Sequence, residues 1–590
     1  MNSGKSNQRS TRMMSCEWCV VAGVLAFALL AACSGGSARA PASLILTNGS
    51  VYTQNGWAEA VAVRDGKIVE VGTSRAVKRL RGPSTRVIEL GGRTVFPGLQ
   101  DSHAHPLLAA REHFQPCRVP PEPVGAVVEA VRDCVRSVPP GSWIASGPIA
   151  PALVDIGFTR KDLDVVAPEN PVMLQVAGTH ASILNTRALK TAGITRSTPA
   201  PPGGVIVHDG AGDPTGVLLD AWSLLPPGPP PPDRKIVARY TSWALEQLLQ
   251  MGVTSVTDAA AERLHLEAYA DLADGGQLKP RVRACLRWTP STTGEVDALL
   301  QEKFSREKLS VRCVKIFLDG ESATARTAAL LEPYQSGDGS PGTERGALTL
   351  DLQTLTSAVT RFDRAGLTIK FHAWGDAAVE EALTAVESAR SANGLNGPHH
   401  EIAHVVLARQ QDLQRAKVLG VALEFSPWLW FPPAGQRVFK DIADSRMQRA
   451  WPVRDALDAG ANAIGGTDWP TAPGRSPWAA IETLVTRLEP EQLESPLYRF
   501  GPTSKGQAEP FAPSQRITLP QAIDLFTRNP ALLSGQADAP GIIAPGRKAD
   551  LIVLDRNPFE VAISEVHKTA ATMVLVAGQV VYEIQAGDRL

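Results

Sequence analysis

The stretch FPGLQDSHAHP, residues 96–106, decides how the rest of this chain is organised. The apolar run 94–99 leads into it, and Asp101 is then followed by His103 and His105. If the run is a strand, its side chains alternate between two faces, so both histidines leave its end on the same side. Two imidazoles make a poor hydrophobic core but a good pair of ligands for zinc-like ions. Packed or surface histidines remain the alternative, because an isolated H-x-H pattern is short.

Outward from this stretch, eight short apolar segments are typical of strands in one parallel sheet. Most of them are followed by helical patterns, such as residues 377–390 and 477–487. This alternation predicts an α/β fold, a TIM-like (β/α)8 barrel. A barrel takes about 250 residues, so the section 93–535 must carry insertions, the largest over about 107–250. The expected strands are TVFPGL, GVTSVTD, RVRACLRW, VRCVKIFLDG, LTIKFHA, HHEIAH, VALEFSP and ANAIGGTD.

The two ends of the mature chain share a strand-rich pattern. In residues 44–92, alternating Val, Ile and polar residues are broken at Asn48-Gly49 and Asp65-Gly66, which are hairpin signals. A similar pattern returns in residues 536–590, where PGRKAD leads into LIVLD and later into MVLVAGQVVYE. We expect both segments to form one small β-sandwich domain beside the barrel.

Residues 1–33 are predicted to be an export signal rather than part of the fold. Three basic residues precede an apolar stretch over residues 20–30, which is too short to span a membrane comfortably. The stretch ends in Leu-Ala-Ala-Cys33, which resembles a bacterial lipobox, so Cys33 is the expected lipid attachment site. Residues 34–43 would then be a flexible tether. An ordinary signal peptide, cleaved at a nearby alanine, is the alternative.

The expected location and partners follow from the same features. Ser34 after the lipidated cysteine is typical of lipoproteins passed on to the outer membrane, so we expect the protein there, facing the periplasm. With 59 basic and 60 acidic residues, the net charge of −1 gives no reason to expect nucleic acid as a partner. Membrane contact is expected through the lipid anchor alone. The sequence leaves open whether copies of the chain associate and whether Cys117 and Cys134 pair.

Ligand-type side chains recur at the C-terminal ends of the expected barrel strands. In a barrel these ends converge on one site. Four histidines and a carboxylate in one cavity would leave costly unpaired polar groups, whereas one or two divalent metal ions would satisfy them. The candidate ligands are His103, His105, Lys315, His372, His404 and Asp468.

Together these motifs resemble the metal-dependent amidohydrolase superfamily. Within it the chain is similar to the branch that contains N-substituted formamide deformylases and many exported hydrolases. The resemblance runs from about residue 44 to residue 582 and is far more specific for the superfamily than for a substrate. The motifs that carry it are FPGLQDSHAHP, VKIFLDG, HAWGD, EIAH, GTDWP and PGRKADLIVLD.

The resemblance implies roles for the candidate ligands. His103 and His105 would hold one ion together with Asp468, and His372 and His404 would hold a second ion, with zinc the expected metal. Asp468 would also act as the acid/base that takes a proton from the attacking water and passes it to the leaving nitrogen. Asp468 is therefore the expected catalytic residue.

Lys315 would be carboxylated on its amine and bridge the two ions, as the resemblance implies. A lysine with its ordinary pKa of about 10.4 stays protonated, so burial beside cations must first drive the amine neutral. A plain salt bridge, for example to Asp319, is the alternative for this residue.

Three residues are candidates for contact with a substrate. The insertion at the catalytic end of the barrel is expected to roof the site, and His180 ends a strand-like piece within it. A buried structural histidine is the alternative. Trp374 and Trp469 lie near strand ends, where aromatic side chains line a pocket as often as they pack in a core.

Two residues depart from the pattern of the family. Ala403 stands where relatives often have an acidic residue before the second-metal histidine, and Asp220 stands where they often have glutamate. His400 or Glu401 could support the ligands instead. Both departures indicate an altered pocket.

The predicted function is a metal-dependent hydrolase that uses metal-activated water to cleave a C–N bond other than a peptide bond. Its expected substrate is an amide-like small molecule, such as an N-acyl, N-formyl or cyclic amide. One alternative is a catalytically degenerate lipoprotein that keeps the fold as a binding module. Another is an esterase, isomerase or decarboxylase that uses the same metal site.

Overall fold

The computed structural model describes residues 40–584 except 179, 227–232, 322–324, 337–338, 428–441, 472–475 and 491–508. Cys33 and the predicted signal segment 1–33 lie outside the described residues, as does most of the predicted tether. In the part of the chain that the structure describes, no helix is both long enough and apolar enough to cross a membrane.

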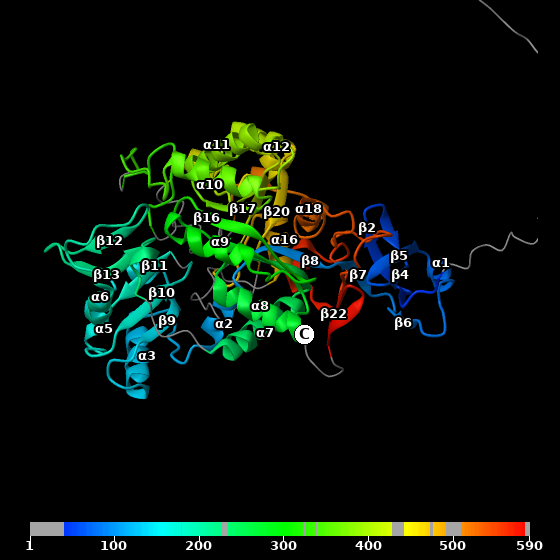
Figure 1. Ribbon diagram of the computed structural model, residues 1–590, viewed down its shortest axis with the longest axis horizontal. Helices are drawn as coiled ribbons and strands as arrows, with labels where there is room; N and C mark the ends of the chain where they lie inside the picture. The colour runs from blue at the N-terminus through cyan, green and yellow to red at the C-terminus, as the bar shows by residue number, and fades with distance from the viewer. Residues whose placement is uncertain are drawn as a thin grey trace, which may run out of the picture.

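A closed parallel sheet lies at the centre of the molecule (Figure 1). Its strand order is β20-β19-β18-β17-β16-β15-β14-β8, and each neighbouring pair is parallel. A bridge between Ala104 and Trp469 joins the two ends of the sheet. The predicted (β/α)8 barrel is therefore confirmed. Its strands are β8 (Leu99–Ala104), β14 (Val253–Ala261), β15 (Arg281–Arg287), β16 (Leu309–Phe317), β17 (Thr368–Ala373), β18 (Glu401–His404), β19 (Ala422–Phe425) and β20 (Asn462–Gly465).

The apolar run 94–99 is not one barrel strand as predicted, because it splits between two sheets. Strand β7 (Thr94–Pro97) pairs with strands of the terminal β-sandwich, and only β8 enters the barrel. Gly98 marks the break, since a Cβ atom there would lie 2.2 Å from Thr254 Oγ1. A continuous apolar run fits a buried strand in either sheet, so the sequence pattern could not show the division.

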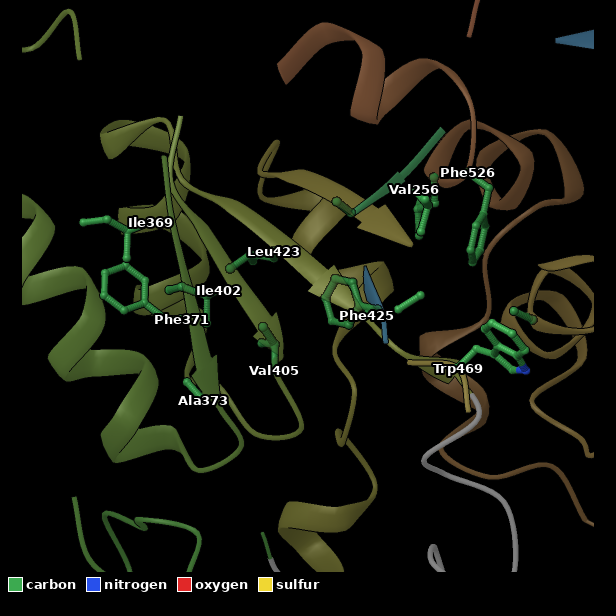
Figure 2. Packing of buried hydrophobic residues seen from close by; sticks show 14 of the residues in the cluster. Val256, Ile369, Phe371, Ala373, Ile402, Val405, Leu423, Phe425, Trp469 and Phe526 are labelled. Carbon is green, nitrogen blue, oxygen red and sulfur yellow. The ribbon is translucent and has the colours of Figure 1, made fainter. Parts of the chain in front are cut away.

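Helices cover the outside of the barrel, and apolar side chains fill the layer between them and the sheet. On β17, Ile369 and Phe371 lie in this layer (Figure 2), while Lys370 and His372 lie on the other face, toward the barrel interior. Each fully buried Ile, Leu or Phe side chain contributes about 1.5–3 kcal/mol to folding. The covering helices are α2 (Pro106–Phe114), α7 (Arg234–Gln250), α8 (Arg263–Asp274), α9 (Thr293–Gln301), α10 (Leu352–Arg364), α11 (Asp376–Asn393), α12 (Gln410–Leu419), α15 (Val453–Asp458), α16 (Pro477–Thr486), α17 (Leu519–Leu525) and α18 (Arg528–Leu533).

Two further sheets join both ends of the described chain into the predicted β-sandwich. Their facing side chains form one core, with Leu46 and Val61 from one sheet and Val95, Val553 and Leu575 from the other. The first sheet has the order β5-β4-β1-β6, and the second has the order β23-β22-β21-β7-β2-β3. Their strands are β1 (Leu44–Thr47), β2 (Ser50–Thr53), β3 (Gly56–Ala58), β4 (Ala60–Arg64), β5 (Lys67–Gly72), β6 (Arg86–Glu89), β21 (Leu551–Leu554), β22 (Ala571–Val576) and β23 (Gln579–Glu583).

The insertion after β8 forms a separate five-stranded sheet with the order β12-β13-β11-β10-β9. It lies on the opposite side of the barrel from the β-sandwich (Figure 1) and has its own hydrophobic core. Its elements are α3 (Val124–Ser137), β9 (Ile144–Ile149), α4 (Ala152–Asp155), α5 (Arg160–Asp164), β10 (Val172–Val176), β11 (Ala181–Leu184), α6 (Thr186–Ala192), β12 (Val205–His208), β13 (Pro214–Leu219) and the 3-10 helix η1 (Trp222–Leu224).

Two disulfides are present among the described residues. Cys117 and Cys134 are joined in the insertion, with Cα atoms 5.5 Å apart, which answers the question that the sequence left open. Cys285 and Cys313 join the neighbouring barrel strands β15 and β16, a pairing that sequence spacing did not indicate.

Candidate metal centre

The histidine pair of the opening stretch faces a carboxylate from the other end of the barrel sheet. His103 lies in β8 and His105 directly follows it, while Asp468 lies in the loop after β20. Asp468 Oδ1 is 3.5 Å from His103 Nε2 and 3.2 Å from His105 Nε2. One ligand atom from each of the three residues lies within 4.8 Å of the others, a grouping that can hold a metal ion.

Hydrogen bonds between the first and last barrel strands hold this group together. Asp101 accepts from the Thr467 backbone N–H at 3.0 Å and from its hydroxyl at 2.5 Å. The Asp468 N–H donates to the His103 carbonyl at 2.7 Å. Asp468 has a φ of 53°, a left-handed conformation that is unfavourable for a residue with a Cβ and is typical of functional sites. The motifs QDSHAHP and GTDWP, from the first and last barrel strands, are therefore joined by hydrogen bonds into one site.

A second grouping shares His103 with the first. It consists of His103, His404 and Glu424, with ligand atoms again within 4.8 Å of one another. Glu424 Oε2 lies 2.5 Å from His103 Nδ1, and the Ser426 hydroxyl donates to Glu424 Oε1 at 2.7 Å. Because Glu424 occupies Nδ1, Nε2 of the same ring is directed to the first grouping.

His372 lies beside the second grouping. Its ring centroid is 4.6 Å from that of His404, and its Nε2 is 3.3 Å from the Gly320 carbonyl oxygen. The structure thus brings His372 and His404 together, although the ligand groupings of the described residues contain His404 without His372.

Lys315 points into the same interior from β16. Its side chain is 1% exposed, and no carboxylate of the described residues lies within ion-pair distance of its amine. Burial, followed by the positive charge of Lys370, lowers the pKa of Lys315 to about 7. The alternative salt bridge to Asp319 is absent, because Asp319 instead accepts backbone N–H groups of Ala329, Trp374 and Gly375.

These donors fit a divalent cation. Burial, together with nearby positive charge, holds the pKa of His103, His372 and His404 well below its ordinary value, so all three imidazoles are neutral at pH 7. A neutral imidazole has a lone pair for a metal ion, and carboxylate oxygens complete such a site.

His180 approaches this cluster from the insertion. Its ring centroid is 5.2 Å from that of His372, and its Nδ1 lies 2.5 Å from Asp220 Oδ1. Burial opposes the charged imidazole, but Asp220 outweighs that effect and raises the pKa of His180 to about 9. Asp220 has a φ of 46° and also accepts from the Thr327 hydroxyl. Asp220, which stands where relatives often have glutamate, therefore contacts His180 directly.

The sequence matches the amidohydrolase family over residues 86–582, most of its length. The chain belongs to the amidohydrolase family. YtcJ of Bacillus subtilis (strain 168) is 30% identical over 555 residues, which cover 91% of this chain and 98% of that protein. N-substituted formamide deformylase of Arthrobacter pascens is 29% identical over 571 residues, which cover 92% and 98%.

The fold of this amidohydrolase also occurs among solved structures. An uncharacterized metal-dependent hydrolase from Pyrococcus horikoshii aligns with a TM-score of 0.67 at 24% identity, covering 88% of this chain and 99% of that one. The predicted superfamily, its deformylase-containing branch and the fold are thus confirmed, and at this level so is the assignment as a hydrolase.

Glu424 is the main residue of this amidohydrolase site that sequence reasoning missed. Neither His400 nor Glu401 takes the supporting role proposed for them. His400 contacts Asp363 at 3.0 Å, and Glu401 pairs with Lys370 and Arg283. Glu424 is the one charged residue in the short, otherwise apolar strand β19. A lone acidic residue in such a buried strand was the sequence feature that could have indicated it.

Both tryptophans expected to contact a substrate lie in the barrel core. Trp374 is 4% exposed and Trp469 is 2% exposed, and each belongs to the main hydrophobic cluster (Figure 2 shows Trp469). The Trp469 carbonyl accepts from the His105 N–H at 2.7 Å. The structure therefore gives both rings a packing position, from which Trp469 also holds the backbone of a ligand histidine.

Proposed function

We propose that this amidohydrolase cleaves a C–N bond other than a peptide bond in an amide-like small molecule, with a bound divalent metal. The convergence of His103, His105 and Asp468 at the closure of the barrel is the observation that carries the proposal. N-substituted formamide deformylase, a relative that aligns over nearly its whole length, supports an N-acyl or N-formyl compound as substrate.

The chemistry divides between the metal and the chain. A divalent ion, for which we propose zinc, would lower the pKa of a water molecule and polarise a substrate carbonyl. Asp468 would take a proton from the attacking water and pass it to the leaving nitrogen, a role supported by its position beside both ligand imidazoles. Glu424 fixes the orientation of the His103 ring. His180, held by Asp220, faces the substrate from the roof.

The proposed site would hold two ions. His103, His105 and Asp468 would hold the first, while His372 and His404 would hold the second. Lys315, carboxylated on its amine, would supply a ligand to both. The burial of Lys315, its lowered pKa and its lack of a carboxylate partner among the described residues support this role, since only a neutral amine reacts with carbon dioxide.

The first prediction tests turnover and its dependence on metal. We expect the purified protein to hydrolyse at least one member of a panel of N-formyl amides, N-acetyl amides and cyclic amides, with one oxygen from labelled water in the product. Chelation should abolish turnover and zinc should restore it. A metal-replete protein that is inactive on amides and esters would favour the binding module. Cleavage of esters alone would favour an esterase, and a product without water oxygen would favour an isomerase or decarboxylase.

Metal content per chain tests the ligand assignment within the same preparation. We expect close to two ions per chain, about half as many in His372→Ala, and extra electron density on the Lys315 amine. His399→Ala is the matched control, because His399 is exposed and contacts only the Gly420 carbonyl in the described structure. Unchanged metal content in His372→Ala would remove His372 from the ligand set.

The location of the protein remains a proposal: exported and held on the periplasmic face of the outer membrane by a lipid on Cys33. Its partners would then be small-molecule substrates and the membrane through that lipid. The disulfides Cys117–Cys134 and Cys285–Cys313 support export, since disulfides persist mainly in oxidising compartments. Association between copies of the chain stays open.

Lipid attachment gives the third prediction. We expect Cys33→Ala to remain unlipidated and to leave the membrane fraction, as measured by fatty-acid labelling. Cys16→Ala, a change within the signal itself, should be acylated like the wild type. Acylation of the Cys33→Ala variant would end the lipobox interpretation.

A further inference from the structure

Arg287 ends barrel strand β15 at the same end as the metal centre. It is the Cα partner of Lys315 on β16, and the C-terminal ends of barrel strands face one site. Unlike Lys315, the Arg287 side chain is 36% exposed, so a ligand can reach its guanidinium.

Two aromatic rings hold this guanidinium in place. It lies 5.6 Å from the ring centroids of Trp222 and of Phe317, which are themselves 5.2 Å apart. Trp222 comes from the insertion and Phe317 from the barrel, so the contact joins the roof to the strand ends. A guanidinium this close to two aromatic faces gains a cation–π attraction that favours its position.

The other arginines of the same strand have close carboxylate partners, whereas Arg287 has only a long, exposed ion pair. Arg281 and Arg283 hold carboxylates of Asp550 and Glu401 at 2.7 and 2.6 Å. For Arg287 the nearest carboxylate of the described residues belongs to Glu262, 3.9 Å away and 60% exposed. An exposed pair at that distance contributes little to stability. Arg287 therefore carries a positive charge that the described protein leaves without a close partner.

The Phe317 ring lies between Arg287 and the residues of the metal centre. The same Phe317 ring lies 4.8 Å from Lys315 Nζ and 5.2 Å from the His372 ring. Trp222, the other ring beside the guanidinium, lies 5.2 Å from the His180 ring. A group bound by Arg287 and a bond placed at the metal centre can thus belong to one small molecule.

We propose that Arg287 binds a carboxylate of the substrate, so that the substrates are N-acylated amino acids or similar amides with a carboxylate near the scissile C–N bond. This inference rests on the proposed function and names its substrate class. The planar guanidinium fork matches a carboxylate in a two-point contact. The charge of the nearby His180 is balanced by Asp220, whose Oδ1 lies 2.5 Å from its Nδ1.

A matched pair of compounds tests the inference. N-acetylphenylalanine and N-acetylphenethylamine differ only in the carboxylate, and both enantiomers of the acid are used. For the metal-loaded wild type we expect kcat/KM to favour the acid by about 10- to 100-fold, the range of a charge-assisted hydrogen bond. Arg287→Met should bring the ratio close to one, mainly by raising KM for the acid, and Arg287→Lys should recover part of it.

Arg361→Met is the matched control, because Arg361 also lies over a ring, that of Phe362 at 4.3 Å, but on α10 and paired with Asp297. Its acid-to-neutral ratio should equal that of the wild type. Calorimetric binding of both compounds separates the two proposals. Tighter binding of the acid that Arg287→Met abolishes supports the inference even without cleavage of either compound. Equal ratios in wild type and Arg287→Met, or no binding preference for the acid, would overturn it.

Discussion

Asp468→Asn is expected to lower kcat by about 10³–10⁴-fold, the upper part of the range for loss of a general acid–base group. The asparagine keeps the size of the side chain and its oxygen toward His103 and His105, which lie 3.5 and 3.2 Å from Oδ1. It cannot accept and release a proton. Metal content, measured on the same preparation, should therefore fall far less than turnover.

Asp258→Asn is the control for this prediction. Asp258 is also a buried carboxylate in a barrel strand, but its Oδ2 accepts from the Tyr269 hydroxyl at 2.9 Å, a bond that asparagine can keep. We expect this variant to retain activity within a few-fold. If Asp468→Asn loses metal and turnover in equal measure, Asp468 is a ligand alone and the acid–base role belongs to another group.

The sequence predicted the barrel and most of the cluster because both depend on local pattern. Strand–helix alternation indicates the fold, and ligand-type residues at strand ends converge in any parallel barrel. His103, His372 and Asp468 could be found in this way, since each follows or ends a recognisable apolar segment.

What the sequence could not predict depends on contacts between distant segments. Glu424 lies 321 residues from His103 along the chain, and no spacing rule connects them. The division of the run 94–99 at Gly98 depends on the approach of Thr254. The Trp222–Arg287–Phe317 contact likewise requires the insertion to fold back over the barrel, which periodicity cannot show.

Lys370 connects two buried carboxylates in the barrel interior, and this ion-pair network is the basis of the last prediction. Lys370 Nζ lies 2.8 Å from Glu401 and 3.8 Å from Glu424, and all three side chains are at most 1% exposed. Arg283 contacts the other oxygen of Glu401 at 2.6 Å. The amine of Lys370 thus neutralises the carboxylate that holds His103 and one that lies deeper in the barrel.

Lys370→Met is expected to destabilise the protein by about 3–5 kcal/mol, the usual effect of removing one partner of a buried ion pair. Methionine fills the space of the lysine stem, so the loss comes from the missing charge: Glu424 loses the ammonium of Lys370, and Glu401 keeps only Arg283. Urea unfolding of the metal-free protein measures it without any change in metal binding. Lys568→Met, at an exposed pair with Glu565, should cost at most about 1 kcal/mol. Equal midpoints for the two variants would contradict the role of Lys370.

The pH dependence of this loss identifies its origin. Burial opposes the charge of Glu401, but Arg283 and Lys370 outweigh it and lower the pKa of Glu401 from 4.5 to about 2. The unfolded chain therefore binds the Glu401 proton first as pH falls, and the stability from this pairing is present above 4.5 and lost between 4.5 and 2. Without Lys370 the pKa of Glu401 in the folded protein rises, so stability depends less on pH between 4.5 and 2. The stability difference between wild type and Lys370→Met should then narrow across that range, whereas a simple packing defect would keep it constant.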